Sequence, residues 1–156
     1  MDLLPLFQSA EATYVGTKVR ESLWMFPVIE CMHLIALAMM GGAVLAVDLR
    51  VFGIGLRSID APDLEATLRP WLAGSVILLF LTGIPMFLSE AIKCYYSPPF
   101  WYKMGLLTVA TIFAFTVRRQ GIRAVRAFPN VARVTAVASL SLWFGVAFAG
   151  RWIAFY

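Results

Sequence analysis

The sequence predicts an all-α fold: a transmembrane four-helix bundle preceded by a short N-terminal amphipathic helix at the membrane interface. Of the 156 residues, 61% are hydrophobic and only 14% are charged, whereas a soluble domain has about a quarter charged residues. Four apolar segments each approach the ~20 residues needed to cross the hydrocarbon core of a bilayer. These segments lack the alternating pattern of barrel strands, so the sequence excludes a transmembrane β-barrel.

The four apolar segments are the expected membrane spans. They cover residues 23–47, 71–89, 101–117 and 134–155. The connections are too short for a second domain, so we expect residues 1–156 to form a single membrane domain. Ahead of the first span, apolar residues recur at roughly helical spacing, which favours a short helix on the membrane surface. These residues are Leu3, Leu6, Phe7, Ala10 and Tyr14.

Basic residues gather in the first and third connections, which lie on the same side of a four-span bundle. Eight of the 13 Lys and Arg residues are found there: Arg50, Arg57, Arg69, Arg118, Arg119, Arg123, Arg126 and Arg133. Cytoplasmic loops carry an excess of basic residues. The bias therefore predicts a bacterial inner-membrane protein with both termini in the periplasm. The same arginines explain the net charge of +4, so we expect the lipid bilayer, and not nucleic acid, as the partner.

Ionisable residues inside the spans are the candidates for chemistry, because a charge at the bilayer centre costs roughly 2.5–3.5 kcal/mol. At 100° per residue, Glu30, His33 and Asp48 fall on one stripe of the first span. Measured at ~1.5 Å per residue, Glu30, Lys103 and Arg151 lie at a similar depth, about 9–10 Å outward from the middle of their spans. The sequence therefore predicts that an acid, a histidine and two cations meet in the outer half of the bundle.

Haem binding is the leading interpretation of this cluster. His33 is the predicted axial ligand of a b-type haem and the predicted metal ligand, with Glu30 orienting its ring. Lys103 and Arg151 are the predicted contacts of the haem propionates. His33 is the only histidine in the chain, so a second axial ligand must come from Met86, Met104, water or another subunit. A homo-oligomer with a shared site would resolve this shortage.

Two other interpretations of the same residues stay open. Glu30 and His33 could form a polar pocket for a proton-coupled molecule such as a quinone, since histidine titrates in the physiological range. Alternatively, Glu30 pairs with Arg151 or Lys103 to lock helices together, which fits a non-catalytic subunit of a membrane complex. A metal or small-solute transporter is the third function considered, because thioethers suit Cu(I). The methionines concerned are Met25, Met32, Met39 and Met40.

Several short motifs resemble an uncharacterised bacterial family of small four-span membrane proteins. The resemblance rests on residues 26–37 (FPVIECMHLIAL), Gly41-Gly42, Asp48-Leu49-Arg50, Thr82-Gly83, Ser89-Glu90-Ala91, Lys103-Met104, Leu106-Leu107 and Gly150-Arg151-Trp152-Ile153. It covers nearly the whole chain and implies no known activity.

A histidine in the first span, followed by glycines, and a lysine opening the third span are more distantly similar to another group. This group comprises the copper-resistance D and HemJ-type protoporphyrinogen oxidase membrane proteins. The similarity implies a four-helix core that binds b-type haem through His33 and, more weakly, a role for Lys103.

The leading hypothesis is thus a haem-binding, cytochrome-like protein of the inner membrane. It would transfer electrons between a periplasmic redox partner and the quinone pool or another membrane subunit. The chain has no GxSxG, HExxH, CxxC or phosphate-loop motif, so no hydrolase, zinc-protease or nucleotide-driven activity is predicted. No catalytic residue is assigned from the sequence.

Overall fold

The computed structural model describes residues 3–55 and 58–155, and every regular element in these ranges is a helix. Four stretches are long and apolar enough to cross a membrane. They are α3 (Met25–Val51), α4 (Ala61–Ser89), α6 (Pro98–Phe113) continued by a π-helical turn (Ala114–Arg118) and α7 (Arg119–Arg123), and α8 (Pro129–Trp152). A 3₁₀ turn (Ile153–Phe155) follows α8. The predicted all-α fold with four spans is confirmed, and Arg57 lies outside the described residues.

The second and third spans extend beyond the predicted bounds. The second was expected to begin at Trp71, after Pro70, but α4 begins at Ala61 and contains both Pro70 and Pro85. A proline removes one backbone hydrogen bond, and membrane helices tolerate this because neighbouring groups can satisfy the freed carbonyl. The third was expected over 101–117 but runs from 98 to 123. Arg118 and Arg119 are therefore part of the helix and not of a loop.

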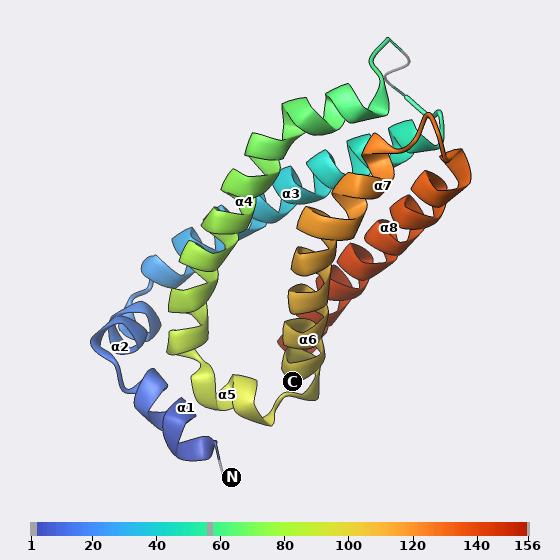
Figure 1. Cartoon of the computed structure of the whole chain (residues 1–156). Coiled ribbons are helices and arrows are strands. Elements are labelled where there is room, and N and C mark those ends of the chain that lie inside the picture. Colours follow the sequence, from blue (N-terminus) through green and yellow to red (C-terminus); the bar gives the residue numbers. More distant parts are fainter. Residues whose placement is uncertain (1–2, 56–57, 156) are drawn as a thin grey trace.

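The long helices form two pairs, α3 with α4 and α6 with α8 (Figure 1). The pairs meet at one end, where α3 also contacts α8 and α7 contacts both α4 and α8. We call this the arginine end, because Arg50, Arg118, Arg126 and Arg133 lie there. Toward the other end the pairs diverge, and α5 (Ala91–Tyr96) connects α4 to α6 (Figure 1). We call this the α5 end.

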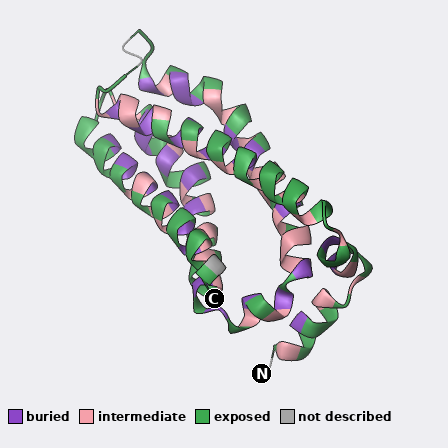
Figure 2. Cartoon of the chain, turned by 180° about the vertical axis from the view of Figure 1, so that it is seen from behind, coloured by how far each residue is buried: buried purple, intermediate pink, exposed green. Residues whose placement is uncertain are grey.

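The buried core lies in the middle of the bundle and at the arginine end. Its two clusters comprise Met40, Val44, Leu72, Ala110, Ala114, Trp143 and Val146, and then Val47, Val51, Ala61, Leu64, Ile122, Ala132 and Ala136. Alanine supplies many of these contacts, and small residues let membrane helices approach closely. The outward helix faces are largely exposed (Figure 2), which suits a bundle whose apolar surface is covered by lipid. The chain thus has the architecture of a multi-pass membrane protein.

Two short helices precede the first span, where one was expected. They are α1 (Leu4–Glu11) and α2 (Tyr14–Glu21). The chain breaks between them because Thr13 caps α2: its hydroxyl accepts a hydrogen bond from the Gly16 N–H at 3.2 Å. Gly16 then packs against α4 so closely that a Cβ there would lie 2.4 Å from the Leu88 carbonyl oxygen. Only glycine permits this approach.

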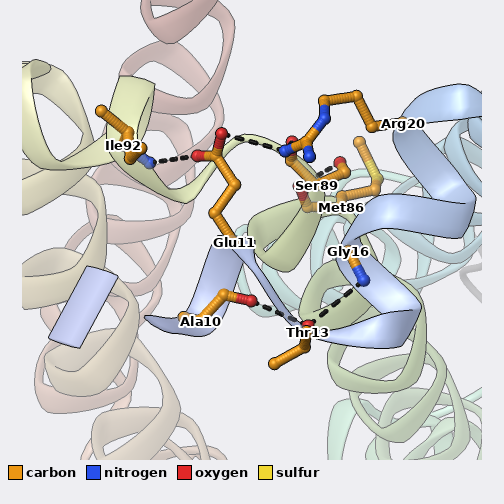
Figure 3. A network of polar contacts seen from close by, with 8 residues as sticks. All are labelled: Ala10, Glu11, Thr13, Gly16, Arg20, Met86, Ser89 and Ile92. Carbon is orange, nitrogen blue, oxygen red and sulfur yellow. Dashed lines mark hydrogen bonds and ion pairs between the residues drawn. The ribbon is translucent and has the colours of Figure 1, made fainter. Parts of the chain in front are cut away.

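Both short helices are anchored to the α5 end. The ring of Phe7 on α1 is buried among four aromatic rings, those of Phe87, Tyr95, Phe100 and Trp101. The Glu11 carboxylate accepts hydrogen bonds from the Ile92 N–H at 2.7 Å and from Arg20 at 2.9 Å (Figure 3). Glu11 therefore joins α1, α2 and the first turn of α5 through a single side chain.

Candidate functional site

His33 lies half-buried on α3 and contacts α4 at the start of the diverging half of the bundle. Its Nδ1 is 2.8 Å from the Thr82 hydroxyl, which in turn donates to the Leu78 carbonyl at 2.7 Å. A hydroxyl has one proton to donate, so Thr82, whose proton goes to Leu78, accepts from the Nδ1–H of His33. In the neutral imidazole, Nε2 is then the unprotonated ring nitrogen. Among the described residues, no side chain or backbone group bonds to Nε2.

Gly83, next to Thr82, makes room for this ring. A Cβ at Gly83 would lie 3.4 Å from His33 Cε1 and 3.9 Å from Nδ1. A larger side chain there would press on the edge of the imidazole that carries its hydrogen bond. The Thr82-Gly83 pair thus supplies both the acceptor and the space that fix the ring of His33 against α4.

Lys103 of α6 is a charged group close enough to act electrostatically on this histidine. Its side chain lies against Gly150 of α8, where a Cβ would be 3.5 Å from Nζ, and it acts electrostatically on His33 and Cys94. Burial, and secondly Glu90, raises the pKa of the Cys94 thiol to about 11. Cys94 is therefore neutral near pH 7 and is no counter-ion. Within residues 3–55 and 58–155, the Lys103 ammonium has no ion-pair partner.

The other two predicted site residues, Glu30 and Arg151, are exposed on α3 and α8. The Arg151 guanidinium lies 5.7 Å from the centroid of the Phe155 ring. Neither Glu30 nor Arg151 makes an ion pair with a described residue. Glu30 was expected to orient the His33 ring, and in the structure Thr82 makes that contact. The structure thus brings His33 and Lys103 toward one another, while Glu30 and Arg151 face outward.

A second polar cluster, at the arginine end, was not predicted. Arg118 donates from Nε and from a terminal nitrogen to the same carboxylate oxygen of Asp48, at 3.1 and 2.9 Å. The two side chains are only 2% and 0% exposed. Arg118 is the last residue of the π-helical turn. The pair therefore connects α3 to the end of the third span inside the core.

The surroundings of this ion pair also balance charge within the protein. Ser139 of α8 is fully buried and interacts with Asp48. Buried Glu65 of α4 faces Arg69 at 3.8 Å. The space between these residues and Arg118 is a cavity of only about 10 Å³, too small for a ligand. Each buried charge here has an opposite charge beside it, so the cluster is suited to joining helices.

Comparison with known proteins shows which family the chain belongs to. Residues 6–156 match the model of a family of unknown function, DUF6644. The chain belongs to this family. The match confirms the predicted membership of an uncharacterised family, and it covers nearly the whole chain. No curated protein and no solved structure matches, so the distant similarity to copper-resistance D and HemJ-type proteins stays a prediction.

Because the family brings no activity with it, the chemistry has to be argued from the side chains. The site at the α5 end offers a ring nitrogen that carries a free lone pair in the neutral imidazole, an ammonium group without a counter-ion in the described part of the chain, and an exposed carboxylate. Polar groups in a membrane are costly when they lack partners. This arrangement is therefore suited to binding a molecule that carries negative charge together with a metal ion or a hydrogen-bond donor for the histidine.

Proposed function

We propose that this family member is a cytochrome-like membrane protein that binds a b-type haem at the α5 end, beside His33 and Lys103. The observation that carries the proposal is the hydrogen bond from His33 to Thr82. Histidines that bind a metal nearly always donate their other ring N–H to a protein acceptor, which fixes the ring and raises its basicity. Thr82 is that acceptor, and Nε2 is left free to bind iron.

The charges near His33 also suit a haem. The Lys103 ammonium has no counter-ion within the described residues, and a haem propionate would supply one. Arg151, exposed on α8, is the second cation available to the propionates. Met86, Met104, water or a group from a second copy of the chain would have to provide any sixth ligand, because the chain has one histidine. When bound, haem supplies one-electron chemistry.

The proposed direction of electron transfer follows from the predicted orientation. If the arginine end faces the cytoplasm, as basic residues favour, His33 lies toward the periplasmic side of an inner membrane. We propose that electrons pass between a periplasmic redox partner and the quinone pool or a neighbouring membrane subunit. His33 and Lys103 would hold the prosthetic group, while Thr82 keeps the imidazole in the tautomer that binds metal.

The direct test is the visible spectrum of the protein purified from cells supplied with a haem precursor. We expect a Soret band that shifts on reduction with dithionite. His33→Ala should abolish the band, and Thr82→Val should shift it or weaken haem retention while keeping the shape of the side chain. Thr108→Val is the matched control, because Thr108 is exposed and bonds only within α6.

Two results would overturn the haem proposal. One is the absence of a Soret band although haem is abundant and the protein is folded, as judged by gel filtration and circular dichroism. The other is a band that His33→Ala leaves unchanged. A quinone-binding site on the same residues would show no Soret band but would retain quinone through purification in a manner that depends on His33.

A non-catalytic subunit of a membrane complex is the second candidate, favoured by one observation. The Glu30 carboxylate is exposed on α3 between the apolar residues Ile29 and Cys31 and lacks an ion pair among the described residues. Such a charge is costly in lipid, and a cation from a partner or a second copy would satisfy it. Light scattering of the purified protein tests this candidate. A higher-order assembly that Glu30→Gln dissociates supports it, and a monomer with no copurifying protein contradicts it.

A further inference from the structure

The arginine end carries a pocket that the proposed haem site does not use. The pocket has a volume of about 250 Å³. It is bounded by the end of α3, the start of α4 and the connection from α7 to α8, which lie together in Figure 1. Its charged lining residues are Arg50, Asp60, Arg126 and Arg133. Two of these side chains lie on α3 and α8, and the other two lie on the segments that precede α4 and follow α7.

The lining carries more positive than negative charge. Asp60 is the only acid among the described lining residues. Its carboxylate accepts a hydrogen bond from Arg126 and lies 4.0 Å from Arg50. Arg133 makes no ion pair within the described residues. Asp63 acts on Arg126 from outside the lining. Two positive charges in the lining are therefore not balanced by a lining carboxylate, and Arg133 is the one with no internal partner.

The start of α4 adds to this positive field. Asp60 occupies the N-cap position, but its side chain makes no hydrogen bond to the helix. Ala61 and Pro62, the first two residues of the 29-residue helix, line the pocket. The N-terminus of a helix carries a partial positive charge and favours anions. The backbone dipole and the arginines therefore act in the same direction on anything bound in the pocket.

We propose that this pocket binds a phosphate group, supplied by an anionic phospholipid headgroup or by a soluble phosphate ester. Guanidinium groups match phosphate oxygens in geometry as well as in charge. Sites for drug-sized ligands have volumes of about 300–1,000 Å³, so a pocket of about 250 Å³ fits a headgroup better than a large cofactor. Its place at the end of the bundle is where lipid phosphates lie, and basic pockets between membrane helices recognise such headgroups.

Two binding measurements on the purified protein distinguish the sources of the phosphate. Native mass spectrometry counts phosphatidylglycerol and phosphatidylcholine molecules retained in a non-ionic detergent. Equilibrium dialysis in the same detergent, without lipid, measures binding of inorganic phosphate. Preferential retention of phosphatidylglycerol identifies a lipid headgroup, whereas binding of inorganic phosphate without a lipid preference identifies a soluble ester. Either result supports the proposal if it depends on the pocket arginines.

Arg133→Gln is the decisive variant, because no ion pair within the described residues is broken by it. It should lower the affinity about five-fold, since one basic residue near an anionic surface contributes about 1 kcal/mol. Arg123→Gln is the matched control: Arg123 is an exposed arginine at the same end and is outside the pocket lining. It should change the affinity by less than two-fold.

Asp60→Asn should have the opposite effect and raise the affinity, because it removes the one negative charge that the described residues contribute to the lining. The proposal is overturned if Arg133→Gln and Arg123→Gln weaken binding equally, which indicates attraction to the basic surface as a whole. It is also overturned if neither probe binds, or if Asp60→Asn weakens binding in a protein that remains folded by circular dichroism.

Discussion

The two ends of the bundle differ in the burial of their charged side chains and in whether those side chains have ion-pair partners. At the arginine end, Arg118 and Asp48 are removed from solvent together and bond to one another. At the α5 end, His33 and Lys103 are only half-buried, and the lysine has no counter-ion in the described part of the chain. A buried charge with an internal partner serves the architecture. A half-buried charge without an internal partner is suited to binding a ligand. Replacing a cation with methionine should therefore change the free energy of unfolding in opposite directions at the two ends.

The largest effect is expected from Arg118→Met. This change leaves the Asp48 carboxylate buried without its cation, and breaking a buried pair in this way costs about 3–5 kcal/mol. We expect the free energy of unfolding, measured by titration with a denaturing detergent, to fall by that amount. Arg119→Met is the control: Arg119 is the adjacent residue, is only partly buried and makes no ion pair with a described residue.

The double variant Asp48→Leu with Arg118→Met tests the cause of that loss. Replacing both partners of a buried pair by apolar residues is often neutral or stabilising, so most of the stability should return. If the double variant is as unstable as Arg118→Met alone, then the volume or shape of the arginine, and not the unpaired carboxylate, is responsible. The contrast between the two ends would then rest on packing.

Lys103→Met should act in the opposite direction. It removes a cation that has no ion-pair partner among the described residues, and the insertion cost of a charge at the bilayer centre, about 2.5–3.5 kcal/mol, sets the upper limit of the gain. We expect the ligand-free protein to become more stable by about 1–2 kcal/mol in the same titration. If haem binds as proposed, the variant should also retain less of it. A loss of stability comparable to that of Arg118→Met would contradict the proposed difference between the two ends.

Most of the fold could be predicted from the sequence, because hydrophobic length alone identifies membrane spans. The exact bounds of the helices were harder to predict. Pro70 suggested a helix start, yet α4 continues through it, since a proline in lipid-embedded helices does not have to end them. The short N-terminal helix was also expected, but its division at Thr13 depends on a cap and on contact between Gly16 and α4. Such tertiary contacts leave no periodic signal.

The Asp48–Arg118 pair shows why the second polar cluster was missed. Arg118 was interpreted as part of a basic connection that indicates topology, and Asp48 as one of three ionisable residues on a single stripe of the first span. Two opposite charges at the same end of neighbouring spans were the available signal. The π-helical turn shifts which face of the third span carries Arg118, so its contact with a residue 70 positions away did not follow from helical periodicity.

A smaller effect is expected at the α5 end from Glu11→Ala. The variant loses the hydrogen bond to the Ile92 N–H and the ion pair with Arg20, which should cost about 1–2 kcal/mol. Because these contacts join α1 and α2 to α5, proteolysis ahead of α3 should accelerate while the four spans stay intact. Glu21→Ala is the control, since Glu21 is exposed and has no ion pair among the described residues. Equal protection in both variants would mean that the aromatic contacts of Phe7 suffice.

The smallest effect on stability is expected from the exposed pair of Asp60 and Arg126 at the arginine end. It should be visible in the pH dependence of the melting temperature. The hydrogen bond and charge of Arg126 lower the pKa of Asp60 below its ordinary value. A carboxyl group with a depressed pKa contributes stability that is fully present above the unfolded value, about 3.9, and is lost as the pH falls through the folded value. The contribution of Asp60 to the melting temperature should therefore stay constant between pH 7 and 5 and decline below about pH 4. Asp60→Asn should remove that part of the decline. If it does not, Asp60 and Arg126 are not coupled in solution, and the Asp60 carboxylate does not neutralise Arg126 in the phosphate pocket.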